Sequence, residues 1–260
     1  MALYLRLLAA SFRARLQYKW DFLINTLLNG LLFAIDFLIV AAIVLRYPLI
    51  GSWNLYEIAL LAGVSGAAYG LVRIFAAELY YFEKYLVTGE FDQCMIRPWP
   101  TLLSVLARNF DFGRFGAVLQ GFLILGIGLK GVLAAGAPWW ILPYSLTLPL
   151  AGAVTLSAIL IVTDAIGFFI IRIDELLIFT VNAPATAANF PASIFPSWLR
   201  RLLIGVLPVA TIAYLPFSYV LGKAGSPLLL LVPYGTAAVA LPIALVVWRW
   251  GERHYQSTGT

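Results

Sequence analysis

Long apolar blocks alternate with short polar segments along the whole 260-residue chain. A bilayer core of about 30 Å needs about 20 apolar residues per helix. The pattern therefore predicts a single transmembrane domain over residues 1–260, an all-α, polytopic membrane protein with six transmembrane helices. The six predicted spans are residues 22–45, 55–82, 113–133, 139–171, 175–192 and 227–250.

The N-terminal segment, residues 1–21, has an amphipathic pattern of its own. At 100° per residue, Leu5, Leu8, Phe12 and Leu16 fall within about an 80° arc, and most of the basic residues lie elsewhere on the helical wheel. This pattern is typical of a helix that lies in the membrane interface ahead of the first span. The alternative is an ordinary cytoplasmic extension of the first transmembrane helix.

The segment between the fifth and sixth spans fits a straight helix poorly. Five prolines fall within residues 184–222, and Arg200 and Arg201 interrupt the apolar run. Each proline removes a backbone donor, and irregular backbone at membrane depth needs protein or water to cover it. We therefore expect outer re-entrant half-helices over residues 193–223. A seventh span over residues 199–221 is the alternative, and it would place the C-terminus outside.

The few charged residues indicate the orientation. Only 11% of the residues are charged and 62% are hydrophobic, whereas a soluble domain carries about 25% charged residues. With the N-terminus inside, eleven of the 17 basic residues fall on the cytoplasmic side and five outside, which agrees with the positive-inside rule. We expect a multi-pass protein of a bacterial-type inner (plasma) membrane with both termini in the cytoplasm.

Several function classes are excluded by absent motifs. No Gly-x-x-x-x-Gly-Lys-Ser/Thr motif occurs, because the Gly222-Lys223 pair is followed by Ala224. The single Cys94 and single His254 provide no metal-ligand cluster and no disulfide framework. Basic residues scattered between apolar blocks indicate topology rather than a nucleic-acid face. We therefore expect no metal, no nucleic-acid partner and no ATP site in this chain.

Polar residues inside predicted spans cost free energy in the bilayer, and they are therefore candidates for a translocation pathway. Three of them lie within about 40° of one another on the first span, and others lie on the second and fourth spans. Arg73 and Asp164 both fall in the cytoplasmic half, which predicts an intramembrane pair. The alternative is that these groups only join helices within one subunit. The candidates are Asn25, Asn29, Asp36, Tyr69, Arg73 and Asp164.

Small residues recur at every fourth position on the second and third predicted spans. Such small-xxx-small runs allow two helices to approach closely. They therefore predict helix packing rather than a particular function. The two runs are Ala62, Gly66 and Gly70, and Gly113, Ala117 and Gly121.

The loop at residues 83–101 has the features of a short, separately capped cytoplasmic helix. Gly89 is suited to end the second span with a positive φ, and Asp92 is suited to cap the helix that follows. Pro98 and Pro100 keep this helix apart from the third span. The helix would present charged residues beside apolar ones, which suits a groove on another protein. These residues are Glu90, Asp92 and Arg97, with Phe91, Met95 and Ile96.

Three parts of the chain resemble ABC-2-type exporter permeases, and together the resemblance covers essentially the whole chain. One is the loop between the second and third spans, one is the segment between the fifth and sixth spans, and one is the C-terminus. The matching residues are Gly89-Glu90-Phe91-Asp92 with Arg97-Pro98, then residues 191–199 with Leu207-Pro208 and Leu215-Pro216, and finally residues 255–259. Arg200 and Arg201 in the outer half-helices depart from the family pattern.

The resemblance implies a permease subunit, not an enzyme. Two such subunits, identical or related, would form the substrate pathway, and two copies of a separate ATPase subunit would bind ATP and Mg. Those ATPases would dock on a coupling helix between the second and third spans. The coupling residues implied are Gly89, Glu90, Phe91, Asp92, Arg97 and Pro98.

Another function class remains open on the residues alone. An ATP-independent secondary transporter or channel would use Asp36, Arg73 and Asp164 as ion-coupling groups. An intramembrane enzyme is disfavoured because no nucleophile and base pair emerges.

Overall fold

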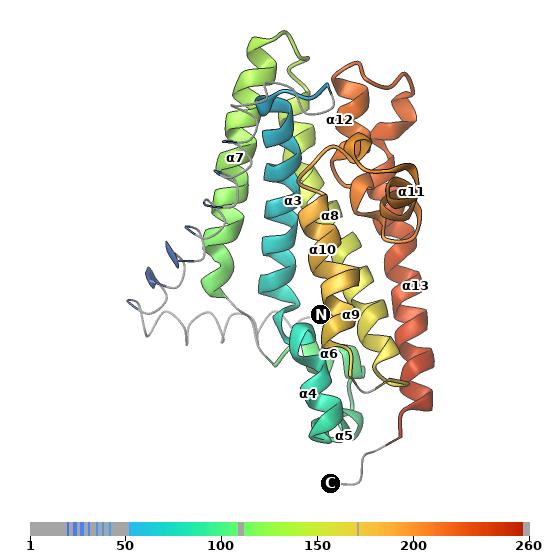
Figure 1. Cartoon of the computed structure of the whole chain (residues 1–260). Helices are drawn as coiled ribbons and strands as arrows, with labels where there is room; N and C mark the ends of the chain where they lie inside the picture. Colours follow the sequence, from blue (N-terminus) through green and yellow to red (C-terminus); the bar gives the residue numbers. More distant parts are fainter. Residues whose placement is uncertain are drawn as a thin grey trace.

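The computed structural model describes residues 52–108, 112–170 and 172–256, together with isolated positions between residues 20 and 42. Throughout these parts the chain is helical (Figure 1). The long helices are α3 (Leu55–Phe75), α7 (Phe115–Ala134), α8 (Ile141–Ile166) and α13 (Val232–His254). The shorter ones are α4 (Phe82–Val87), α5 (Glu90–Met95), α6 (Thr101–Leu106), α9 (Asp174–Leu177), α10 (Ala183–Ala187), α11 (Ser197–Gly205) and α12 (Tyr214–Val220).

Four of these helices are long and apolar enough to cross a membrane, namely α3, α7, α8 and α13. They confirm the second, third, fourth and sixth predicted spans, and the protein is an all-helical, multi-pass membrane protein. The predicted interfacial helix at residues 1–21 and the first span at residues 22–45 lie largely outside the described residues.

Helix α3 is the centre of the bundle and packs along both α7 and α8 (Figure 1). Its N-terminus is closed by a capping box in which Asn54 Oδ1 accepts from Glu57 N and Glu57 Oε2 accepts from Asn54 N. Such reciprocal bonds satisfy two backbone donors that a helix start leaves unpaired. Asn54 therefore defines where the second span begins.

The contact between α3 and α7 depends on glycines. A Cβ added to Gly121 would lie 2.5 Å from the backbone nitrogen of Ala67, and one on Gly63 would lie 2.4 Å from that of Leu125. The predicted close packing is thus present. Gly66 of the predicted run also faces α7, since a Cβ there would lie 4.0 Å from Gly121 Cα, although this position has room for a small side chain.

The predicted fifth span at residues 175–192 is shorter in the structure. Helix α9, a π-helical segment at residues 178–182 and α10 form one helical run over residues 174–187. At 1.5 Å per residue this run is about 21 Å long, which is less than the bilayer core. The chain leaves the helix before Pro191, whose missing N–H cannot continue it.

The proline-rich segment forms two helices rather than one straight span. Helix α11 and the helical segment Pro208–Val220, which includes α12, meet at an angle of 71°. Both lie toward the end of the bundle opposite α5, and α13 then runs from that end to the α5 end (Figure 1). A straight seventh span over residues 199–221 is therefore absent, and the two predicted half-helices are present as helices.

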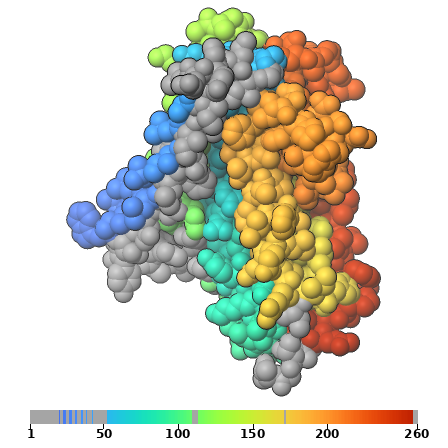
Figure 2. Space-filling model, viewed as in Figure 1, coloured from blue at the N-terminus to red at the C-terminus, as the bar shows by residue number. Residues whose placement is uncertain are grey.

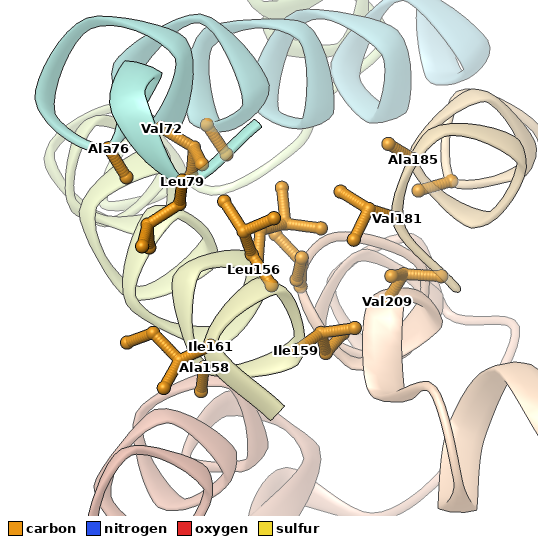
Figure 3. Packing of buried hydrophobic residues seen from close by; sticks show 14 of the residues in the cluster. Val72, Ala76, Leu79, Leu156, Ala158, Ile159, Ile161, Val181, Ala185 and Val209 are labelled. Atoms are coloured by element: carbon orange, nitrogen blue, oxygen red, sulfur yellow. The ribbon is translucent and has the colours of Figure 1, made fainter. Parts of the chain in front are cut away.

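The core lies where α8 meets α3, the π-helical segment and the 3-10 turn at residues 208–211. Figure 3 shows buried side chains of these elements converging on Leu156, which is 2% exposed. Because α8 contributes to most of these contacts, it fixes the positions of the shorter helical pieces around it. The labelled residues are Val72, Ala76, Leu79, Leu156, Ala158, Ile159, Ile161, Val181, Ala185 and Val209.

Candidate functional site

The loop between α3 and α7 folds into three short helices at one end of the bundle (Figure 1). Gly89 has φ 69°, a left-handed conformation that glycine adopts without strain, and α5 starts directly after it. The predicted positive φ at Gly89 is confirmed, but the helix before it is α4, because α3 already ends at Phe75. The predicted capping role of Asp92 is wrong, because Asp92 is the third residue of α5 and no side chain caps that helix.

Phe91 anchors α5 in the protein interior. Its side chain is fully buried, which corrects the expectation that it faces a partner. It belongs to an aromatic cluster of five residues from four parts of the chain, with ring centroids 5.0 to 6.3 Å from that of Phe91. The cluster joins α5 to the chain just beyond α8 and to the end of α13. Its members are Phe82, Phe91, Phe168, Trp248 and Tyr255.

Ion pairs hold α5 against its neighbours. Arg108 donates to Glu90 Oε2 at 2.6 Å and to Gln93 Oε1 at 3.3 Å, and Lys84 Nζ lies 3.8 Å from Glu90. The hydrogen bond from Arg108 holds the pKa of the Glu90 carboxyl below its ordinary value. Glu90, predicted to contact an ATPase, is therefore engaged within the chain.

Replacing this carboxylate has a pH-dependent consequence. A carboxyl group with a lowered folded-state pKa stabilises the fold above its unfolded pKa, and this contribution is lost as the pH falls through the folded pKa. We expect Glu90→Gln to lower the thermal midpoint slightly at pH 7, and the difference from the parent protein to shrink below about pH 4. Thermal unfolding of the purified protein at both pH values measures this.

Glu175→Gln is the matched control, because Glu175 is exposed and forms no ion pair within the described ranges. If both variants lowered the thermal midpoint at pH 7 equally, the ion pair between Glu90 and Arg108 would make no specific contribution to stability.

The tip of this region is apolar and exposed. Ile96 is 84% exposed, Trp99 48% and Met95 46%. Arg97 and Pro98 are also exposed, and Asp92 is half-buried. We call residues 95–99 the apolar tip. Three large hydrophobic side chains without cover form a patch suited to a protein partner. Trp99 was not among the residues predicted from the sequence, although an aromatic residue between two prolines could have indicated it.

A pocket of about 520 Å³ lies between the lower part of α3, α4 and the α9 to α10 run. Arg73 lines it with its guanidinium 4.1 Å from the ring centroid of Tyr80. Asn182, in the π-helical segment, also lines it and accepts a hydrogen bond from Tyr69 Oη at 2.9 Å. The predicted residue Arg73 thus lines the pocket, whereas the predicted residue Tyr69 does not line it and is joined to it through Asn182. π-Helical segments occur frequently at functional sites.

Another candidate, Asp164, does not line this pocket. Asp164 is fully buried on α8, and neither carboxylate oxygen has a hydrogen-bond partner in the described part of the chain. The expected pair between Arg73 and Asp164 is therefore wrong, since Arg73 stacks on Tyr80 instead. Asn25, Asn29 and Asp36 lie outside the described residues.

Asn182 was not among the candidates predicted from the sequence. It is a polar residue inside the fifth apolar block, so the rule that singled out Tyr69 would also have found it. Within residues 52–108, 112–170 and 172–256, no group of three His, Cys, Asp or Glu side chains could hold a metal ion.

The described residues thus combine four helices long and apolar enough to span a membrane, a folded loop with an apolar tip and a polar pocket between helices. Residues 31–259 match the family model described as ABC-2 family transporter protein. The chain belongs to the ABC-2 transporter family, whose permeases work with an ABC ATPase. Comparison with curated proteins and with solved structures found no match.

Proposed function

We propose that this chain is the permease subunit of an ATP-driven exporter, and that a separate ATPase subunit docks on the apolar tip. The main observation in support is a difference in burial within one short region. Ile96 is 84% exposed, whereas Phe91 is fully buried. A partner that binds the tip would push on α5, and α5 is held to the ends of α8 and α13 by the aromatic cluster. A packed core transmits such a displacement as movement of whole helices.

In this proposal ATP and Mg are bound by the partner, two copies of which serve a dimer of permease subunits. The second subunit is identical or related. Helix α5 and the end of α13 lie at one end of the bundle, which supports a cytoplasmic position for the coupling loop and the C-terminus together. With an even number of spans, the N-terminus is cytoplasmic as well. The membrane that the protein spans is a bacterial-type inner membrane, and its lipids surround the protein.

The pocket beside Arg73 is proposed as part of the substrate pathway. It lies at the same end of α3 as the coupling loop, and Lys84 and Thr88 of that loop line it. A movement of α4 and α5 would therefore change the shape of the pocket directly. Asn182, which is held by the hydrogen bond from Tyr69, provides a polar contact, and Tyr80 provides an aromatic surface.

The docking site is tested by a charge placed in the apolar tip. We expect Ile96→Glu to reduce copurification of the ATPase by about 30-fold or more, because buried apolar anchors dominate protein interfaces. Arg97→Glu and Asp92→Arg should uncouple ATP hydrolysis from transport without unfolding the protein. Copurification, ATPase rate and transport are measured on the same reconstituted complex.

Trp139→Glu is the control, because Trp139 is 79% exposed in the loop between α7 and α8 at the opposite end of the bundle. It should leave ATPase binding intact. Undiminished copurification with Ile96→Glu would reject the docking site.

A separate measurement distinguishes the export proposal from an ATP-independent transporter. The purified chain is reconstituted alone in liposomes under an ion gradient, with no ATPase present. Export driven by ATP predicts no transport here and transport after the ATPase is added. Transport by the chain alone would overturn the proposal.

A further inference from the structure

Helix α11 is amphipathic and lies on the surface toward the end of the bundle opposite α5 (Figures 1 and 2). One side packs inward through Leu203, which is 2% exposed. The other side carries Trp198, which is 64% exposed, and Arg201, which is also exposed and lies one turn further on. The exposed apolar residue Val206 follows directly after the helix.

The arginines of α11 form no ion pair with an acidic residue in the described part of the chain. The sequence contains no Asp or Glu between Glu175 and Glu252. In the described ranges Arg200 and Arg201 form no ion pair, and the one protein hydrogen bond of Arg201 runs from its Nε to the carbonyl oxygen of Ser197. Two adjacent guanidinium groups therefore remain available to an anion.

Among the described residues, the acidic side chain at the start of α3 is already engaged. Glu57 lies at the start of α3 and pairs with Lys223 at 3.1 Å, and it also closes the capping box with Asn54. Lys223 in turn donates to the carbonyl oxygen of Ser52 at 2.7 Å. Within the described residues, no acidic side chain therefore pairs with Arg200 or Arg201.

We propose that α11 lies in the membrane interface and that Arg200 and Arg201 bind the phosphate groups of anionic phospholipids. Guanidinium groups match phosphate oxygens in charge and geometry. Tryptophan is enriched at the depth where acyl chains meet headgroups, and long basic side chains reach from that depth to the headgroups. Trp198 and Val206 then lie at the apolar boundary. The anchor holds the half-helices at a fixed depth and does not depend on the export function.

Native mass spectrometry of the full chain in detergent tests the anchor. The probes are phosphatidylglycerol, phosphatidylcholine and inorganic phosphate, each titrated separately. We expect preferential retention of phosphatidylglycerol, and a loss of affinity on the order of 30-fold in the double variant Arg200→Gln, Arg201→Gln, because each basic residue near an anionic surface contributes about fivefold.

Two control variants make the result specific. Lys130→Gln removes another exposed basic residue, placed near the end of α7, and should keep the preference. The double variant Arg200→Lys, Arg201→Lys keeps the charge and should restore most of the binding. Thermal unfolding in detergent without added lipid shows whether each variant is folded.

Retention of both phospholipids to the same extent by the parent protein would overturn the proposal. So would an unchanged preference in a folded double glutamine variant. If inorganic phosphate competes fully with phosphatidylglycerol, the site recognises a free anion such as a substrate group, and the lipid assignment fails.

Discussion

Gly121→Leu is expected to separate α3 from α7 and to unfold a large fraction of the protein. A Cβ at this position would lie 2.5 Å from the backbone nitrogen of Ala67 and 2.8 Å from its Cα. Backbone atoms cannot rotate away as a side-chain end does, so the helices must move apart. Overpacking costs typically 1–3 kcal/mol, and we expect about 3 kcal/mol or more here. The yield of monodisperse protein and its thermal midpoint measure the loss.

The matched control is Gly126→Leu, on the same helix. In the described part of the structure, no atom outside the helix's own backbone lies within 4 Å of a Cβ built on Gly126, which is exposed. It should keep the yield and the thermal midpoint of the parent. Equal losses for the two variants would mean that leucine at any glycine of α7 is harmful, and the close contact between α3 and α7 would then not be the cause.

Phe91→Ala is expected to cause the second large effect, on both stability and coupling. Removing a buried phenylalanine costs about 3–5 kcal/mol, because the lost contacts leave a cavity. The neighbours here are rings fixed by several helices, and Trp248 is also held by its Nε1 hydrogen bond to Thr101 Oγ1 at 3.0 Å. The site cannot collapse easily, so the loss should fall in the upper part of that range.

The functional consequence separates docking from transmission of force. The apolar tip is unchanged in Phe91→Ala, so the ATPase should still copurify, whereas transport per ATP hydrolysed should fall. Ile96→Ala is the control for stability, since Ile96 is 84% exposed and its truncation leaves no cavity. Phe91→Leu, which fills most of the volume, should lie between the parent and Phe91→Ala in thermal midpoint. Full coupling in a folded Phe91→Ala protein would refute transmission through the cluster.

The buried carboxylate of Asp164 shows the limit of reasoning from polar residues in spans. Such residues are expected to pair with one another or to line a pathway. Arg73 and Asp164 are similar in depth, and depth was the basis for pairing them. Pairing also needs facing side chains, and Arg73 lies over Tyr80 while Asp164 has no partner in the described residues. The rotation of α3 relative to α8 decides this, and it depends on their packing.

The fifth span shows a different limit. Hydropathy measures how apolar a segment is, and residues 175–192 are apolar enough for a span. It does not measure whether the segment remains one regular helix. In the structure a π-helical segment at residues 178–182 and the turn before Pro191 limit the helical run to residues 174–187. Asn182 and Arg73 then line one pocket, and Tyr69 bonds to Asn182, because this shorter run packs beside α3.

The sequence by itself determined the class of the protein, four of its spans, the positive φ at Gly89 and the broken helix within residues 193–223. Each of these follows from local properties: apolar length, a glycine with positive φ, or a proline without an N–H. Only the tertiary structure decided that Phe91 is an anchor and Ile96 a contact surface. The two residues are five positions apart in one short segment, and the return of α13 beside α5 buries the first and leaves the second exposed.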